Sequence, residues 1–193
     1  MKPHSIAFLI CWQGPFPWYF PYFLKSCRFN PDIEFLIFTD NIEENLDIPA
    51  NVKIVPYSLE QFNANASKKL GFEVAVESGY KLCDFKPALG FIFSGYIEKY
   101  DFWGYCDIDL IFGNIRAFMT NELLGEYDII SARHDYLTGC FSLYRNNQYM
   151  RELFKQSKDY KKVFTKPRNF FFDETNYAFE AFEKGLHYSQ SDE

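Results

Sequence analysis

Two carboxylates one residue apart stand near the middle of the chain. Asp107 and Asp109 end the apolar segment Phe102–Asp109 and are followed shortly by Gly113. Anionic groups at the end of a buried strand are costly unless a cation meets them. Mg²⁺ and Mn²⁺ prefer oxygen ligands and often bridge them to substrate phosphates. The pair therefore indicates a divalent-cation site, and the plainer alternative is a structural pair of acids.

The segments around this pair predict an α/β domain. Apolar runs predict strands over Ile6–Trp12, Glu34–Asp40, Val52–Pro56, Phe102–Asp109, Tyr127–Ala132 and Cys140–Tyr144. Helical spacing or helix-start signals predict helices over Trp18–Phe29, from Ser58 onward, and over Leu82–Tyr100, Met150–Gln156 and Thr175–Lys184. Strands that alternate with helices favour a largely parallel sheet, and ligands of such sheets bind at the carboxyl ends of the strands. We therefore expect Asp107 and Asp109 at the ligand-binding edge.

Several motifs resemble the GT-A nucleotide-sugar glycosyltransferases, and most closely a bacterial group associated with polysaccharide synthesis. The motifs are Lys81–Gly90, Tyr100–Gly113, Thr39–Asn41, Gly139–Asn146 and Phe172–Glu174. The resemblance covers nearly the whole chain. It implies one GT-A-like (Rossmann-like) domain over residues 1–193, with a mostly parallel central sheet flanked by helices.

The resemblance also implies a metal-dependent donor site. In such enzymes the Asp-x-Asp motif holds Mn²⁺ or Mg²⁺ against the donor diphosphate, and Asp107 and Asp109 occupy its positions. Lys86 lies where many members carry a cation that approaches the donor sugar or diphosphate, as a lysine ammonium can. Its plainer interpretation is an exposed helix lysine.

Three further residues are implied to bind the donor. Trp12 follows the first strand, where a GT-A fold receives the nucleotide. Asp40 follows the second strand and either accepts a hydrogen bond from the base or ribose or closes a turn. Gly139 precedes a strand at which donor and acceptor approach the backbone in these enzymes. No Gly-rich dinucleotide or P-loop pattern is present in the sequence.

Asp173 and Glu174 are the candidate catalytic residues. An inverting transferase needs a carboxylate that takes the proton of the acceptor hydroxyl, and either residue can serve. The alternative is a helix start, because acidic residues just before Thr175 complement a helix dipole.

Charge and cysteine content narrow the class of protein. The chain of 193 residues has 20 Lys and Arg against 26 Asp and Glu, a net charge of −6, so a uniformly basic nucleic-acid-binding surface is not expected. Its five cysteines are odd in number and form no CxxC motif, which favours a reducing compartment.

No apolar run approaches a membrane span, so we expect a cytoplasmic protein. The basic, aromatic segment Tyr160–Phe172 allows peripheral contact with the inner face of the membrane but is more typical of a surface loop.

The expected function is transfer of a sugar from a nucleotide-sugar donor to a hydroxyl of a glycan or lipid-linked glycan. A non-catalytic carbohydrate- or nucleotide-binding domain of the same fold is the main alternative. A glycoside hydrolase is a third, although the Asp-x-Asp spacing suits a metal better than an opposed acid and nucleophile. The resembling enzymes generally continue well beyond their Phe-Asp-Glu segment, whereas this chain ends about twenty residues after it, so truncation at the C-terminus is one expectation.

Overall fold

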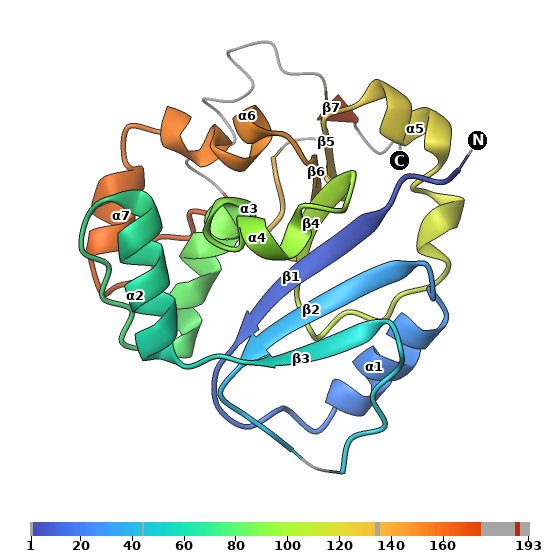
Figure 1. Ribbon diagram of the computed structural model, residues 1–193, viewed down its shortest axis with the longest axis horizontal. Helices are drawn as coiled ribbons and strands as arrows, with labels where there is room; N and C mark the ends of the chain where they lie inside the picture. The colour runs from blue at the N-terminus through green and yellow to red at the C-terminus, as the bar shows by residue number, and fades with distance from the viewer. Residues whose placement is uncertain (1, 44, 134–135, 175–187, 190–193) are drawn as a thin grey trace.

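One mixed sheet organises the protein, for which a computed structural model describes residues 2–43, 45–133, 136–174 and 188–189. Within this part the sheet has seven strands in the order β3-β2-β1-β4-β6-β5-β7 (Figure 1). The strands are β1 (Ile6–Trp12), β2 (Ile33–Thr39), β3 (Val52–Pro56), β4 (Phe102–Cys106), β5 (Ile129–Ser131), β6 (Phe141–Arg145) and β7 (Tyr188–Ser189). Each described strand except β6 runs in the same direction, and β6 pairs antiparallel with β4 and β5.

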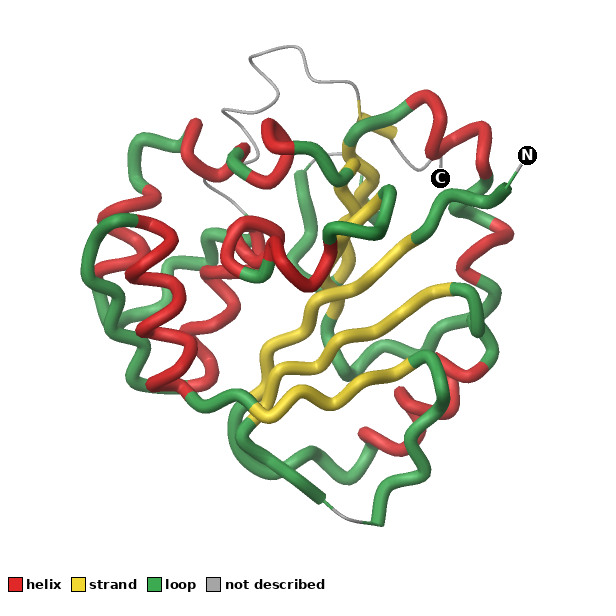
Figure 2. Tube along the Cα trace, viewed as in Figure 1, coloured by secondary structure: helices red, strands yellow, loops and turns green. Residues whose placement is uncertain are grey.

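The helices flank this sheet, as the tube in Figure 2 shows. They are α1 (Phe20–Arg28), α2 (Leu59–Leu70), α3 (Leu89–Ile92), α4 (Ser94–Ile97), α5 (Asn121–Glu126), α6 (Gln148–Arg151) and α7 (Tyr160–Thr165), with 3₁₀ segments η1 (Gly79–Ala88), η2 (Ile115–Ala117) and η3 (Leu153–Gln156). The predicted fold class, an α/β domain with a mostly parallel sheet flanked by helices, is confirmed.

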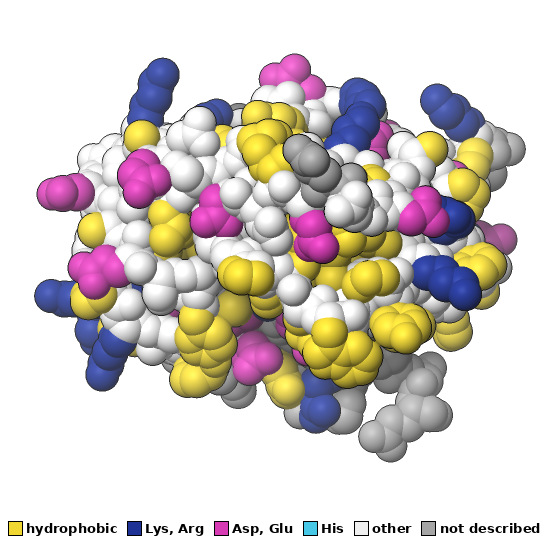
Figure 3. Space-filling view, turned by 90° about the horizontal axis from the view of Figure 1, so that it is seen from below, with side chains coloured by type: hydrophobic (Ala, Val, Ile, Leu, Met, Phe, Trp, Pro, Cys, Tyr) yellow, Lys and Arg dark blue, Asp and Glu magenta, His cyan; other side chains and the backbone are white. Residues whose placement is uncertain are grey.

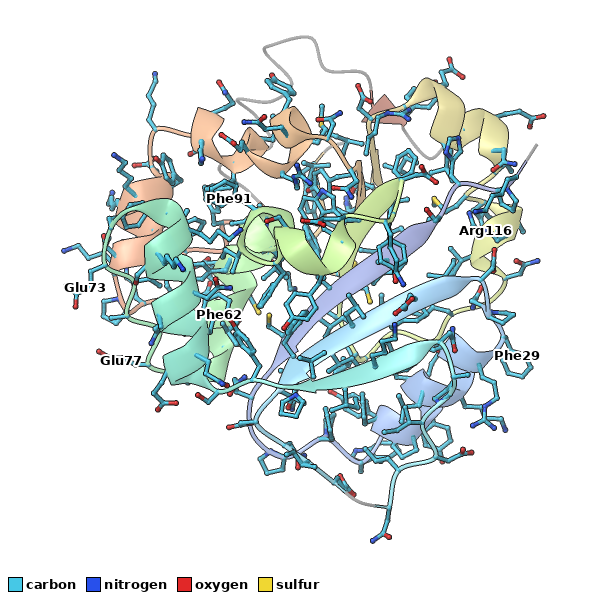
Figure 4. The ribbon with its side chains drawn as sticks, in the orientation of Figure 1. Phe29, Phe62, Glu73, Glu77, Phe91 and Arg116 are labelled. Carbon is cyan, nitrogen blue, oxygen red and sulfur yellow. The ribbon has the colours of Figure 1, made fainter. Side chains whose placement is uncertain are left out.

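Alternating side chains of β1 divide the core into two layers. Ala7 and Leu9 pack with α2, η1, α3, η3 and α7, whereas Phe8 and Ile10 pack with α1 and α5 on the opposite face. Successive residues of a strand point to opposite faces, so a fully apolar strand serves both layers. Figure 4 shows Phe62 of α2 turned toward η1, where its ring meets Phe85 edge-on at 5.2 Å.

Local sequence signals account well for α1 and α2. Pro21 lies in the first turn of α1, where its missing N–H costs nothing. Ser58 caps α2 and forms a reciprocal capping box with Gln61, and the helix ends at Gly71 in the left-handed conformation.

The continuous helix predicted over Leu82–Tyr100 is wrong, because this segment forms η1, α3 and α4 in succession. Pro87 lies near the end of η1 rather than in a first helical turn, and it supplies no amide hydrogen there. Gly90 lies flat against the Trp103 indole, so closely that a Cβ would stand 2.3 Å from Cε2. Phe93, between α3 and α4, has a φ of −102° and a ψ of 26°, so the chain turns there instead of continuing as one helix.

Several other boundaries differ from the predictions, and two of these differences concern charged segments. β4 ends at Cys106, so Asp107 and Asp109 lie in the loop after the strand and not within it. The basic segment after residue 160 begins with α7, whose Val163 and Phe164 are buried, and is not simply a loop. The helix predicted over Thr175–Lys184 lies outside the described residues.

In the part of the chain that the structure describes, helices are short, and none is long and apolar enough to cross a bilayer.

Candidate functional site

A pocket of about 680 Å³ opens at the carboxyl ends of β1 and β4. Its lining includes Trp12, Lys86, Asp107, Asp109, Asp173 and Glu174, all of which are predicted site residues. The loops that follow β1 and β4 and the segment after α7 are brought together here by the parallel sheet. The sheet thus assembles six of the candidates in one place.

Lys86 is the centre of a charged group that we call the pocket cluster, consisting of Lys86, Asp107 and Asp173. The Lys86 ammonium donates to Asp107 Oδ1 at 2.6 Å and lies 3.2 Å from Asp173 Oδ2. It also donates to the carbonyl oxygen of Gly139 at 2.8 Å. The Lys86 side chain is 12% exposed, so it is not the solvated helix lysine of the plainer interpretation.

The charges around Lys86 keep it protonated. Burial by itself lowers the pKa of the ammonium, but the adjacent carboxylates of Asp107 and Asp173 outweigh burial and raise the pKa above its ordinary value. A permanent positive charge therefore faces the pocket.

Gly139 makes close packing of this cluster possible. Its carbonyl accepts from Lys86, and a Cβ at this position would lie 2.2 Å from Asp173 Oδ2. Glycine is required here by this approach of the carboxylate, not by its backbone angles. The residue precedes β6, and the neighbouring Cys140 carbonyl accepts from the Asp107 amide at 3.0 Å, which extends the pairing of β4 and β6 into the site.

Asp173 has a different environment from an ordinary surface carboxylate. Its side chain is 5% exposed, and burial raises its pKa to about 6, with a further upward contribution from Glu174 and an opposing one from Lys86. A carboxylate with a pKa near neutrality can exchange a proton under physiological conditions.

Glu174 and Asp109 extend the acidic surface outward. Glu174 is half-buried, and Asp109 is exposed. Both line the pocket, so bound molecules can reach their oxygens directly.

The other two donor-binding candidates have local roles as well. Trp12 is half-buried, and its indole N–H donates to the Pro15 carbonyl at 3.2 Å while the side chain lines the pocket. Asp40 is exposed and accepts from the Gly14 amide at 2.7 Å, where Gly14 has a φ of 86°. Asp40 thus closes the loop after β1 and does not belong to the lining of the pocket in the described part of the chain.

A second charged group, which we call the clasp, consists of Lys81 and Asp84. The Lys81 ammonium donates to Asp84 Oδ2 and to the carbonyls of Val163 and Arg168, each at 2.7 Å. The side chains are 1% and 0% exposed. This pair is not among the residues predicted from the sequence, but its spacing of three is a usable signal, because residues i and i+3 share one face of a 3₁₀ helix.

Asp107 and Asp109 can hold a metal ion only if a bound ligand supplies further oxygen atoms to it. Among the described residues, no three His, Cys, Asp or Glu side chains converge where they could hold a cation. Mg²⁺ commonly takes one or two protein carboxylates and completes its shell with phosphate oxygens and water. Asp107 and Asp109 therefore suit a cation that arrives with a diphosphate, and within the described chain they do not form a cage of their own.

The thiols in this region do not suit nucleophilic chemistry. All five cysteines are free, and Cys11 and Cys83 line the pocket. Burial raises the pKa of Cys83 to about 11 and also that of Cys11, so both remain thiols at neutral pH.

The fold and the site together define an α/β domain with a charged pocket at the carboxyl edge of its sheet. Residues 8–192 match a family described as "Family of unknown function (DUF6625)", and the chain belongs to this family. No curated protein matches the chain in sequence.

Two solved structures are similar to this chain at a low level. The glycosyltransferase GlyE of Streptococcus pneumoniae TIGR4 is 14% identical with a TM-score of 0.45, and the match covers 100% of this chain and 46% of that one. The apo form of GlyE is 13% identical with a TM-score of 0.41, covering 80% and 37%. The chain thus spans less than half the length of both.

Proposed function

We propose that this protein is a GT-A-like glycosyltransferase that moves a sugar from a nucleotide-sugar donor to a hydroxyl of a glycan or lipid-linked glycan. The observation that carries the proposal is the pocket cluster. Lys86, Asp107 and Asp173 come from distant parts of the chain and meet at the carboxyl edge of the sheet, in a pocket of about 680 Å³. The Asp-x-Asp spacing and the segments that resemble GT-A enzymes give this pocket its chemical interpretation.

The donor diphosphate is assigned to the side of the pocket near Lys86, Asp107 and Asp109. Asp107 and Asp109 would hold Mn²⁺ or Mg²⁺, which supplies positive charge to the leaving diphosphate. The permanent charge of Lys86 acts in the same direction, because it stabilises the negative charge that develops as the bond to the sugar breaks.

The acceptor side is assigned to Asp173 and Glu174. With a pKa of about 6, the Asp173 carboxylate is ionised at neutral pH and able to take the proton of an acceptor hydroxyl. The hydroxyl oxygen then bonds to the anomeric carbon, the bond from that carbon to the diphosphate breaks, and a nucleoside diphosphate leaves. Glu174 contributes a second carboxylate that can accept hydrogen bonds from sugar hydroxyls.

One observation favours a second candidate, a non-catalytic carbohydrate- or nucleotide-binding domain. Lys86 contacts both carboxylates and the Gly139 carbonyl at once, so each charged group of the cluster has a partner without a ligand. A binding domain requires no more than this.

Calorimetric titration tests the donor site. UDP-, GDP-, CMP- and dTDP-sugars are titrated into the wild type and Asp109→Asn, each with Mn²⁺ and with chelator. We expect one nucleotide class to bind more tightly with Mn²⁺, and the metal to bind more tightly with that donor by the same factor. Asp109→Asn should lose this coupling, whereas the control Asp47→Asn, whose side chain is 85% exposed and pairs with Arg28, should keep it.

The same proteins together with Asp107→Asn separate the two functions. Transfer or slow hydrolysis of the bound donor, lost in Asp107→Asn, supports the transferase. Metal-independent donor binding in all proteins would remove the metal site from the proposal, and donor binding with no turnover under any condition would favour the binding domain.

A further inference from the structure

Phe171 holds an unusual backbone conformation two residues before Asp173. Its φ is 56°, and it is the one non-glycine residue with positive φ in the described part of the chain. Left-handed backbone is unfavourable for any residue with a Cβ, and most of all for a bulky one. Such strain persists only where the surroundings enforce it, and it concentrates at functional sites.

The hydrogen bonds on both sides of Phe171 enforce this conformation. The amides of Phe170 and Phe172 donate to the buried Asp84 carboxylate at 2.9 Å, and Lys81 secures Asp84 in turn. The Phe171 amide donates to Asn169 Oδ1 at 2.8 Å. Three consecutive amides are therefore held by side chains, which leaves Phe171 no route to relax.

The consequence is an aromatic ring displayed at the pocket. Phe171 is 52% exposed and lines the pocket together with Tyr80, which is 64% exposed. The Asn169 side chain connects the backbones of Tyr80 and Phe171, since its Nδ2 group also donates to the Tyr80 carbonyl at 3.3 Å. The same turn carries the candidate base, because the Glu174 amide donates to the Phe171 carbonyl at 3.1 Å.

Exposure alone does not distinguish these rings. Hydrophobic side chains gather at several places on the surface in Figure 3, and Phe29, at the end of α1, is 69% exposed (Figure 4). What sets Phe171 apart is that an energetically costly backbone, backed by a buried ion pair, presents its ring beside Asp173.

We propose that Tyr80 and Phe171 form the platform on which a pyranose ring of the acceptor stacks. The C–H groups on the face of a pyranose are weakly positive and favour the negative face of an aromatic ring. The carboxylates of Asp173 and Glu174 lie beside the platform and accept hydrogen bonds from the hydroxyls around the sugar edge. This inference rests on the proposed function and assigns its acceptor class as carbohydrate.

The charges disfavour an anionic membrane as the occupant of this platform. Lys166 and Arg168 are exposed nearby, but the platform itself borders two carboxylates, and the whole chain has a net charge of −6. Anionic headgroups would be repelled where a neutral sugar is not.

The test compares Phe171→Ala and Tyr80→Ala with the control Phe29→Ala. Saturation-transfer NMR is recorded with methyl glucoside, methyl galactoside, methyl mannoside and methyl N-acetylglucosaminide, and donor affinity is measured by calorimetry on the same proteins. We expect at least one glycoside to bind the wild type and Phe29→Ala, and its affinity to fall roughly tenfold in each platform variant. Donor affinity should not change in any of them.

Four results would overturn the platform. These are no binding of any glycoside to the wild type, equal binding to wild type and Phe171→Ala, loss of donor affinity in Phe171→Ala, and Phe171-dependent sedimentation with phosphatidylglycerol vesicles. Circular dichroism confirms that each variant is folded. If metal-coupled donor binding holds while the glycoside result fails, the acceptor assignment is wrong and the transferase proposal stands; loss of both removes both.

Discussion

Lys81 and Lys86 lie five positions apart on η1 and belong to charged groups of opposite character. In the clasp, Lys81 uses its three hydrogens on Asp84 and two carbonyls, and Asp84 accepts from two amides in addition. In the pocket cluster, the Asp107 side chain is 37% exposed, Asp173 has a raised pKa of about 6, and a cavity lies beside them. A charged group that is fully enclosed can only hold the chain, whereas carboxylates that border a pocket can still receive a ligand or a proton.

The pocket cluster is expected to give the largest effect on transfer. Lys86→Met should lower kcat by about 100-fold or more, because it removes charge stabilisation aimed at the leaving group. The midpoint of urea unfolding should fall less than in the corresponding clasp variant, because Asp107 is 37% exposed and Asp173, whose pKa is already raised, takes up a proton when the lysine is removed. Steady-state kinetics measures kcat and urea titration measures stability, and the control is Lys162→Met, which replaces an exposed lysine of α7. Unchanged kcat would place Lys86 with the clasp as a structural residue.

Removing the lysine of the clasp should mainly lower the stability of the protein. Lys81→Met leaves the Asp84 carboxylate buried without its cation, which should cost about 3–5 kcal/mol of unfolding free energy. Trypsin should cleave more readily after Arg168, whose carbonyl Lys81 holds at 2.7 Å. The double variant Lys81→Met/Asp84→Leu should recover part of the stability, because no buried charge remains. A loss below about 1 kcal/mol in the single variant would contradict this account.

Asp173 predicts a pH dependence with a definite sign. If it is the base, kcat/KM should rise about tenfold per pH unit below pH 6 and level off above it, and Asp173→Asn should abolish the rise. Its raised pKa means that the folded state binds the proton more tightly than the unfolded chain. The contribution of Asp173 to stability is therefore present at low pH and is lost as the pH increases from about 4 to about 6, by about 3 kcal/mol. Rate profiles and urea midpoints across this range give the two readouts, and a flat rate profile through pH 6 would exclude Asp173 as the base.

Phe171 should give the smallest effect. Phe171→Gly and Phe171→Ala both remove the ring, but only glycine adopts the φ of 56° without strain. The glycine variant should therefore be more stable than the alanine variant by about 1 kcal/mol in urea unfolding. Equal stability would show that the clasp imposes no backbone strain at this position.

Local patterns were sufficient for much of the framework. The strands Ile6–Trp12 and Val52–Pro56 have the predicted bounds, and Ser58 begins α2 as predicted. Apolar runs and capping residues act over a few positions, so the chain itself encodes them. The segment Leu82–Tyr100 was mispredicted because its apolar spacing is compatible with one helix, whereas η1 ends just after Pro87 and Phe93 leaves the helical conformation between α3 and α4.

The sequence by itself determined which side chains were available for chemistry and that a parallel sheet would gather them at one edge. Only the tertiary structure decided their partners. Lys86 lies 53 positions from Gly139, and Asp84 lies 88 from Phe172, separations at which local propensity carries no information. Which of the two lysine–aspartate groups is fully enclosed and which borders a pocket depends on the segments that pack against η1. That choice is made by burial and by hydrogen bonding across the fold, where an unpaired buried group is too costly to persist.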